Sequence, residues 1–401
     1  MRININGEAI MLEDPESSDE ETPVPDSDSC KTDELQRLFK LNIENSNEIA
    51  ASPNRACGLY LSLSHDSRTL AVGLSQREVQ IYQISTNKEL TLNDTHVNES
   101  AVRGARFFNE DSNLCMTCRI DGTITLYDLR IKKPIAFLED CSEGTKKTVT
   151  SFDINQNDRV ICASTEVQKS GDSFVLFYDV RQREFLGSYW ECHSEDITNV
   201  RFHPKNPDLL ASGSVDGLIN VFDISQSCED DAMQYCFNVE NSIETLNWHF
   251  SPAKKDWISC ITTTNDFHLF DVEDQAQEVE FSREKLTSEI RRTSSIDCNV
   301  IAAHNNQSEF FLLAGSNYNK GECLRTLRYD NKGFVPHWNL QHNAQIVRAS
   351  VYNEKENCLI TTGEGGLITV WSCDGDAQEE TEPSKPTKRR LHISGHRAKP
   401  Y

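Results

Sequence analysis

The sequence predicts an all-β fold made of one repeated unit. Segments of five to seven residues alternate apolar and polar side chains, and Asp, Asn, Gly and Pro separate them, which is typical of strands with one buried face. One such segment in each unit ends near a large apolar residue, at spacings of 44 to 57 residues: Tyr82, Tyr127, Tyr178, Phe222, Phe270, Leu327 and Trp371. Seven units of four short antiparallel strands predict a seven-bladed β-propeller.

The strands of each unit can be placed in order along the chain. First strands are expected within residues 102–112, 149–158, 197–207, 243–252 and 346–356. Second strands with a following turn are expected within 113–122, 208–217 and 358–366, and third strands within 123–130, 174–181, 218–225, 267–273 and 367–373. Helical spacing of Phe281, Leu286 and Ile290 predicts a short helix in the long connection before unit six.

The ends of the chain predict how the ring closes. After Trp371 the chain becomes acidic, so the last unit lacks a fourth strand. Near the front, Leu35, Phe39, Leu41 and Ile43 stand among polar neighbours, and a strand there would complete the last blade and protect its edge. We therefore expect three parts, at residues 1–33, 34–374 and 375–401: a disordered acidic tail, the propeller with its outer strand from about 35–43, and a disordered tail with a basic end.

Charge and composition exclude several functions. The formal net charge is −23, which argues against a propeller that coats nucleic acid or an anionic membrane. No apolar run approaches the about 18 residues of a membrane helix, and the broken N-terminal sequence does not predict a secretory signal. The 14 cysteines are scattered, which favours reduced thiols over a disulfide framework.

The fourth unit, residues 191–224, resembles a WD repeat, and the chain is identified by it as a member of the WD-repeat superfamily. The resemblance implies that His193, Ser212, Asp216 and Phe222 form the structural tetrad of that family, with Phe where Trp is usual. His193, Ser212 and Asp216 superficially look like a Ser-His-Asp catalytic set, but their spacing matches the tetrad, in which buried polar groups pair with one another.

Two neighbouring units end in the same four-residue pattern, Tyr-Asp-x-Arg, at 127–130 and 178–181. The pattern resembles the signature of substrate receptors of cullin-4 ubiquitin ligases. The resemblance implies a partner-binding site in which Arg130 and Arg181 contact the adaptor of the ligase, while Asp128 and Asp179 help to hold each arginine and its turn. An exposed guanidinium braced by a carboxylate is a directional group for binding a protein. The alternative is a local salt bridge in each turn, which contributes little.

No motif predicts catalysis, a metal or another cofactor. The sequence contains no G-x-S-x-G, no phosphate-binding glycine loop and no H-E-x-x-H. Cys115 and Cys118 lack a second pair of ligands, and residues three apart on a strand point to opposite faces. We therefore expect a protein that is not an enzyme; an enzyme remains a remote alternative.

The leading hypothesis is a non-catalytic scaffold that mediates protein–protein interactions, in one version as a substrate receptor of a cullin-4 ligase. The alternative is a nuclear propeller whose acidic body binds basic proteins such as histones or ribosomal proteins. Lys388, Arg389 and Arg390 form a basic cluster near the C-terminus and predict nuclear targeting, so a nuclear or cytoplasmic location is expected.

Overall fold

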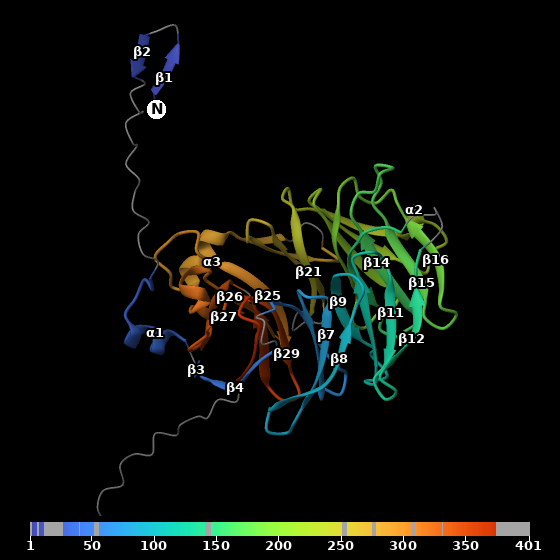
Figure 1. Cartoon of the computed structure of the whole chain (residues 1–401), viewed down its shortest axis with the longest axis horizontal. Helices are drawn as coiled ribbons and strands as arrows, with labels where there is room; N and C mark the ends of the chain where they lie inside the picture. The colour runs from blue at the N-terminus through green and yellow to red at the C-terminus, as the bar shows by residue number, and fades with distance from the viewer. Residues whose placement is uncertain are drawn as a thin grey trace, which may run out of the picture.

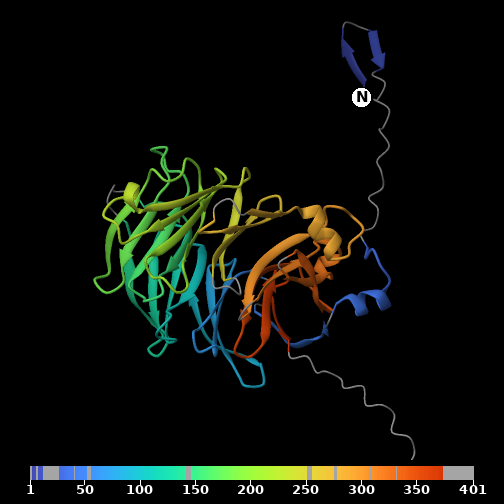
Figure 2. The ribbon, with the colours of Figure 1, turned by 180° about the vertical axis from the view of Figure 1, so that it is seen from behind.

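The predicted seven-bladed β-propeller is confirmed. The computed structural model describes residues 2–5, 8–11, 27–39, 41–51, 56–140, 146–250, 255–274, 278–306, 309–330 and 332–373. Seven sheets stand around a common axis, and each sheet is antiparallel from its inner to its outer strand, apart from one added edge strand (Figures 1 and 2).

The first four blades follow one another without crossovers. Blade 1 contains β5 (Gly58–Leu63), β6 (Thr69–Leu74), β7 (Glu78–Ile84) and β8 (Leu90–Val97). Blade 2 contains β9 (Val102–Phe107), β10 (Leu114–Arg119), β11 (Ile124–Asp128) and β12 (Lys133–Leu138). Blade 3 contains β13 (Val149–Ile154), β14 (Val160–Thr165), β15 (Val175–Asp179) and β16 (Glu184–Tyr189). Blade 4 contains β17 (Ile197–Phe202), β18 (Leu209–Ser214), β19 (Leu218–Asp223) and β20 (Met233–Asn238), with the short helix α2 (Glu229–Ala232) before its last strand.

The remaining blades carry the additions to the basic plan. Blade 5 contains β21 (Ile243–Phe250), β22 (Asp256–Thr262), β23 (Phe267–Asp271) and β24 (Glu278–Phe281), and the predicted short helix follows as α3 (Arg283–Glu289). Blade 6 contains β25 (Asn299–Asn306), β26 (Glu309–Gly315), the 3₁₀ turn η1 (Tyr318–Gly321), β27 (Leu324–Tyr329) and β28 (Phe334–Leu340). Blade 7 contains β29 (Val347–Asn353), β30 (Cys358–Gly363) and β31 (Leu367–Ser372).

The hydrophobic core is divided among the blade junctions. The buried apolar residues form seven clusters, and each cluster spans two neighbouring blades. One cluster joins Met116 of blade 2 to Tyr178 of blade 3, and another joins Leu70 of blade 1 to Val370 of blade 7. The middle strands are buried on both faces, so burial between blades rather than within any one blade holds the ring together.

An N-terminal strap closes the ring, but through residues other than those predicted. Residues 35–38 belong to helix α1 (Thr32–Leu38), and β3 (Leu41–Ile43) pairs in parallel with β28 as a fifth strand of blade 6. The outer strand of blade 7 is β4 (Asn45–Ala50), which pairs antiparallel with β31. The prediction of a strand over 35–43 is therefore wrong. Leu35 and Phe39 are four residues apart and are both buried, which is a helical rather than an alternating spacing.

The strap begins before residue 34. The backbone N–H of Ser29 donates to the carbonyl of Arg291, and the backbone N–H of Thr293 donates to the carbonyl of Ser27. Asp28 lies between Arg325 of blade 6 and Arg292 of the connection that follows α3, and both arginine side chains are buried. Farther toward the N-terminus, β1 (Arg2–Ile5) pairs with β2 (Glu8–Met11) as a separate two-stranded sheet. Most of the predicted tails, residues 12–26 and 374–401, lie outside the described residues.

Two histidines on the inner strands, His249, which is buried, and His304, which is half-buried, give stability a defined pH dependence. His249 donates from Nδ1 to Asn305 Oδ1 at 2.5 Å and accepts from Ser259 Oγ at 2.7 Å, and His304 Nε2 lies 2.8 Å from Ser350 Oγ. Burial lowers the pKa of His249 to about 4, and burial together with the charge of His249 lowers the pKa of His304 to about 4. At pH 5 each histidine is therefore neutral in the folded chain, whereas the same side chain is protonated in the unfolded chain.

We expect the urea midpoint to fall between pH 7 and pH 5, with each of these two histidines contributing about 2 kcal/mol of lost stability at pH 5. The sign follows because the folded pKa is depressed: stability is complete above the ordinary histidine pKa and decreases as the pH falls toward the folded value. Buried His96 and His203 shift in the same direction. The variant His249→Gln should be less stable at pH 7 but should lose less on acidification; an unchanged pH slope would contradict the assignment.

Candidate partner-binding site

The structure brings His193, Ser212 and Asp216 of blade 4 into one hydrogen-bonded chain. His193 donates from Nδ1 to Asp216 Oδ2 at 3.0 Å, and its Nε2 accepts from Ser212 Oγ at 2.7 Å. Burial would raise the pKa of Asp216, but hydrogen bonds from His193 and from two backbone N–H groups outweigh burial and hold that pKa below its ordinary value. The histidine, the hydroxyl and the carboxylate are thus engaged with one another and with the backbone, and Ser212 is fully buried, which is the arrangement expected of the structural tetrad.

The fourth tetrad position differs between blades. Phe222 is fully buried beside this network but has no donor to offer. In blade 7 the corresponding Trp371 donates from Nε1 to Thr361 Oγ1 at 3.0 Å. In blade 2 the hydroxyl of Tyr127 donates to Asn98 Oδ1 at 3.4 Å, so an asparagine replaces the histidine of the family pattern. Phe222 therefore contributes packing alone, whereas the aromatic residues of blades 2 and 7 also pair a polar group.

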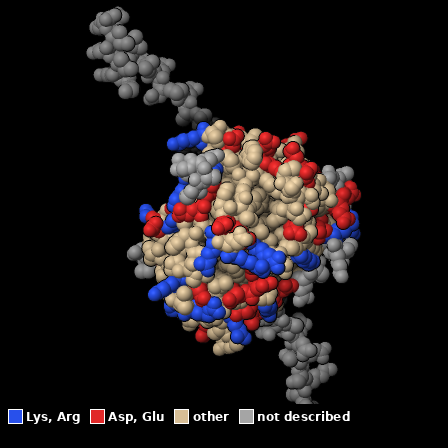
Figure 3. All heavy atoms as spheres, turned by 90° about the vertical axis from the view of Figure 1, so that its right-hand side faces the viewer, with Lys and Arg blue, Asp and Glu red and all other residues tan. Residues whose placement is uncertain are grey.

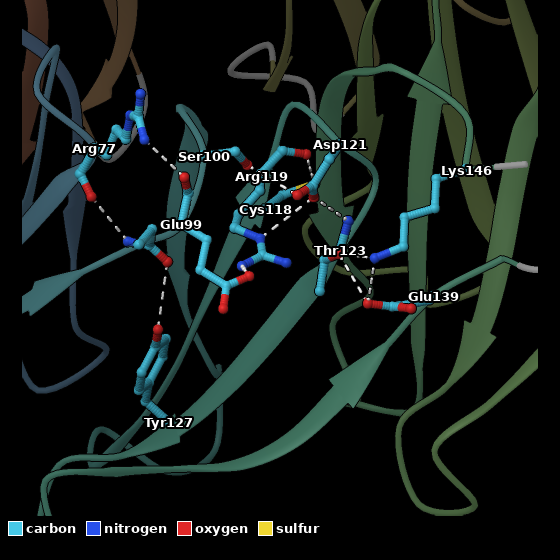
Figure 4. A network of polar contacts seen from close by, with 11 residues as sticks. Arg77, Glu99, Ser100, Cys118, Arg119, Asp121, Thr123, Tyr127, Glu139 and Lys146 are labelled. Atoms are coloured by element: carbon cyan, nitrogen blue, oxygen red, sulfur yellow. Dashed lines mark hydrogen bonds and ion pairs between the residues drawn. The ribbon is translucent and has the colours of Figure 1, made fainter.

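A polar network covers the loops at one end of blade 2 (Figure 4). Asp121 accepts from Ser100 Oγ at 3.0 Å, from the backbone N–H of Thr123 at 3.0 Å and from Arg119 Nε at 3.3 Å. Arg119 is 8% exposed and also reaches Glu99, which is 89% exposed, at 3.2 Å. The carboxylate of Asp121 points toward cations and hydroxyls of this same network (Figure 4), which therefore organises the loops.

The same network continues to the loop before blade 3. Glu139 accepts from Thr123 Oγ1 at 3.0 Å and from Lys146 Nζ at 2.8 Å. Hydrogen bonding to Lys146 lowers the pKa of Glu139 and raises the pKa of Lys146, so both remain charged near neutral pH. The two charged groups neutralise each other, which leaves this end of blade 2 as a rigid polar surface.

The first Tyr-Asp-x-Arg pattern forms a braced arginine at the end of β11. Asp128 Oδ1 accepts from Arg130 Nε at 2.9 Å, and Asp128 Oδ2 accepts from Arg130 Nη2 at 2.6 Å. The side chain of Arg130 is 58% exposed, whereas that of Asp128 is 14% exposed. Asp111 lies 3.9 Å from the same guanidinium. The two parallel hydrogen bonds fix the plane of the guanidinium while leaving its remaining donors in solvent.

The second pattern is built differently. Asp179 Oδ1 accepts from the backbone N–H of Gln182 at 2.6 Å, and among the described residues the structure gives it no ion pair with Arg181. Arg181 is exposed. Arg183 instead crosses to blade 2 and donates from Nη1 to the carbonyl of Ile135 at 3.1 Å. The sequence predicted two equivalent arginines, whereas the structure braces only Arg130.

The two turns together form a positively charged surface, the basic edge. It consists of exposed residues from the ends of β11 and β15: Arg130, Lys132, Lys133, Arg181 and Arg183. Lys132 donates from Nζ to the carbonyl of Asn93 in blade 1 at 3.0 Å, so the edge links blades 1, 2 and 3. Figure 3 shows a band of Lys and Arg across this side of the molecule, with acidic residues around it. Lys132, Lys133 and Arg183 were not predicted as site residues, although the run of basic residues after each pattern was the available signal.

Cys115 and Cys118 do not form a common site. Both lie on β10, but Cys115 packs between blades 1 and 2 and Cys118 between blades 2 and 3. Burial raises the pKa of Cys115 to about 12 and raises that of Cys118 as well. Among the residues that the structure describes, no group of three or more His, Cys, Asp and Glu could hold a metal ion, and no helix is long and apolar enough to cross a membrane.

The family model for the WD domain, G-beta repeat, matches residues 184–223, from the start of β16 to the end of β19. This repeat and the seven blades, six of four strands and one of five, together decide the family. The chain is a WD-repeat β-propeller. The match covers the outer strand of blade 3 and the first three strands of blade 4, the part of the chain that contains His193, Ser212 and Asp216.

Several WD-repeat proteins are similar to this WD-repeat propeller over most of its length. WD repeat-containing protein 89 homolog of Dictyostelium discoideum is 24% identical over 342 residues, 84% of this chain and 90% of the relative. The sequences of residues 161–181 and 193–224 also resemble WD repeat-containing protein 89. An uncharacterized WD repeat-containing protein of Saccharomyces cerevisiae is 26% identical over 313 residues, 75% of each chain. WD repeat-containing protein GTS1 of Arabidopsis thaliana is 23% identical over 387 residues, 90% of this chain and 92% of the relative.

These relatives indicate a protein-interaction scaffold of the generally non-catalytic WD-repeat class. The WD-repeat propeller offers such a scaffold two kinds of surface, the basic edge and the acidic remainder. The predicted targeting residues Lys388, Arg389 and Arg390 lie outside the described residues, so nuclear targeting stays a prediction.

Proposed function

We propose that this WD-repeat propeller binds the adaptor of a cullin-4 ubiquitin ligase through the basic edge and serves as a substrate receptor. The observation that supports this most is Arg130, which is held in two parallel hydrogen bonds by Asp128 and is still 58% exposed. A pre-oriented arginine loses little conformational entropy when it binds a partner. The exposed side chain of Ile131, the next residue in the sequence, supplies apolar contact area.

We expect the two arginines to contribute unequally. Arg130→Ala should weaken binding of the purified adaptor by about tenfold or more, because interface arginines contribute about 2 kcal/mol when they anchor a contact. Arg181→Ala should have a smaller effect, because Asp179 does not brace it. Arg348→Ala is the matched control: Arg348 is an exposed arginine of blade 7 that pairs with Glu364 at 3.0 Å. Titration of the full chain with adaptor gives each dissociation constant.

Affinity purification from cells supplies the second readout. The adaptor should co-purify with the wild-type chain and with Arg348→Ala, and should be lost from the Arg130→Ala, Arg181→Ala double variant. If the double variant retains the adaptor, or if the wild type never recovers it, the receptor proposal is wrong. In that case the paired turns serve only to brace neighbouring blades.

A second candidate rests on charge. The whole chain carries −23, its last residues are basic, and acidic side chains surround the basic edge (Figure 3). Such a surface favours basic nuclear proteins, and association that depends on charge weakens steeply as salt is raised. Binding of core histones that does not change between low and high salt would count against this candidate.

A further inference from the structure

An open groove separates blades 3 and 4 on the outer side of the propeller. Its volume is 440 Å³, and it lies between β16 with Trp190 on one side and the segment from Ile224 to Glu229 on the other. Its floor is apolar: Val160, Phe177, Tyr189 and Ile224. Phe177 and Tyr189 are in edge-to-face contact, with ring centroids 4.8 Å apart, so the floor is a packed surface rather than a mobile one.

Two large apolar side chains at the rim remain in water. Leu186 is 55% exposed and Trp190 is 52% exposed, although Phe177 between the strands is only 8% exposed. Exposed apolar area of this kind carries a free-energy cost that burial against a partner would remove. Leu92 on β8 and Phe137 on β12 are also more than half exposed, but neither lines this groove, whereas Leu186 and Trp190 both do.

The charge along the groove is uneven. At one end, Glu229 accepts from the backbone N–H groups of Trp190 and Glu191 at 2.9 and 3.0 Å, and Asp230 and Asp231 follow in α2. No Lys or Arg lines the groove. At the other end, β16 begins next to Arg183 of the basic edge. Figure 3 shows the corresponding face, with a wide area free of charged side chains between acidic residues and the basic band.

The backbone of β16 is also accessible. β16 is the outer strand of its sheet, and among the described strands it pairs with β15 alone. A Cβ built on Gly187 would meet nothing within 4 Å, so a second chain can approach the strand closely at its centre. An extended segment can therefore add backbone hydrogen bonds to side-chain contacts.

We propose that this groove binds an extended segment of a partner protein that carries a large apolar anchor followed by Lys and Arg. The anchor fills the floor between β16 and Ile224, and the basic residues lie beside Glu191, Glu229 and the first turn of α2. The charge gradient along β16 sets the direction, because the basic end of the segment is repelled by Arg183 and attracted by α2. The groove is separate from Arg130, where the adaptor contact is proposed. The inference rests on the second candidate function, the binding of basic proteins, and places that binding in the groove.

The test uses the full chain and a fluorescein-labelled short peptide with the order Leu-Ser-Phe-Gly-Lys-Arg-Lys. Two control peptides replace either Leu and Phe by Ser or the basic residues by Glu. Fluorescence anisotropy should show saturable binding of the first peptide and at least about tenfold weaker binding of both controls. Equal binding of all three peptides, or binding of none, would overturn the proposal.

Protein variants locate the site. Leu186→Ser should weaken the peptide by about tenfold, and Glu229→Gln should weaken it several-fold and reduce its salt dependence. Leu92→Ser is the matched control, because Leu92 is also 55% exposed but lies on β8 of blade 1. Arg130→Ala should leave peptide binding unchanged, which separates this result from that of the proposed function. If Leu92→Ser and Leu186→Ser weaken the peptide equally, the groove is not the site.

The chain itself offers a competing occupant, which the same assay distinguishes. Residues 384–401 contain Lys388, Arg389 and Arg390 followed by Leu391 and carry no acidic residue. If the groove serves a partner, charge reversal of these three basic residues leaves peptide affinity unchanged. A gain of about tenfold on charge reversal would show that the chain's own basic end competes for the groove, and it would overturn the assignment to a partner.

Discussion

A chain that begins at residue 52 will not fold into a stable propeller, whereas a chain that begins at Ser27 will keep the stability of the full-length protein. The reason is that residues 27–50 supply parts of two blades. β4 gives blade 7 its outer strand, with Leu367 opposite Ala50 and Val370 opposite Asn47, and Ser46 Oγ donates to the carbonyl of Val370 at 2.9 Å. Without these residues both blades expose an unpaired strand edge, which favours aggregation.

The strap also places a carboxylate between buried cations. Asp28 Oδ1 lies 2.8 Å from Arg325 Nη2 and 3.1 Å from Arg292 Nη1, and the two arginine side chains are 5% and 7% exposed. Arg292 has a second partner in Asp297 at 2.8 Å. The ring of Phe39 is buried and lies 5.4 Å from the guanidinium of Arg325. Removal of the strap therefore takes this carboxylate away from the buried guanidinium of Arg325 and leaves Arg292 with Asp297.

Point variants test the strap without truncation. Asp28→Ala should cost about 2 to 3 kcal/mol of unfolding free energy, because it removes a carboxylate from the buried guanidinium of Arg325, although Asp28 itself is 31% exposed. Asp33→Ala is the control: Asp33 is exposed in the first turn of α1 and should change stability by less than about 1 kcal/mol. Thermal melts followed by circular dichroism, together with soluble yield of chains beginning at Ser27, Asn45 and residue 52, give the comparison. If the chain beginning at residue 52 melts like the full-length chain, the strap is dispensable and this account is wrong.

The middle of each blade could be predicted from sequence because its signal is local. Strands such as β18 and β19 are buried, short and separated by an Asp-Gly turn, so alternation and turn residues appear together. Outer strands are harder to predict. β4 has the sequence NSNEIA and is exposed at four of its six positions, so it carries almost no apolar alternation. The outer strand was predicted at residues 35–43 because these are more apolar, although the spacing of Leu35 and Phe39 is helical.

The same distinction between local and long-range signals applies to the contacts of the candidate site. The contacts of His193 with Ser212 and Asp216, and of Asp128 with Arg130, lie within single repeats, so residue spacing predicts them. Contacts between blades depend on the distance between neighbouring sheets, which spacing does not encode. The reach of Arg183 to Ile135 belongs to this class, and so does the groove between β16 and α2. The different use of Asp179 arises because the backbone N–H of Gln182 occupies its carboxylate.

The ion pair between Asp140 and Lys147 is expected to produce the second large effect. Lys147 Nζ lies 2.6 Å from Asp140 Oδ2, and the two side chains are only 4% and 2% exposed. The ammonium also lies 4.8 Å from the ring centroid of Phe174 in blade 3. The pair thus joins the end of blade 2 to the beginning of blade 3 in a site from which water is excluded.

Breaking this pair from one side should be costly, and removing both charges should not. Asp140→Ala should lower the unfolding free energy by about 3 to 5 kcal/mol, because it leaves a buried ammonium without this carboxylate. The double variant Asp140→Leu, Lys147→Met should lie within about 1 kcal/mol of wild type, since an apolar pair of similar volume avoids the desolvation of both charges. Lys146→Ala is the control: this adjacent lysine is 43% exposed and pairs with Glu139 at 2.8 Å, so its loss should cost less than about 1 kcal/mol. Urea unfolding of wild type and the three variants gives each unfolding free energy. If the double variant is as unstable as Asp140→Ala, the attraction between the two charges stabilises the junction of blades 2 and 3, and the expectation that an apolar pair can replace them is wrong.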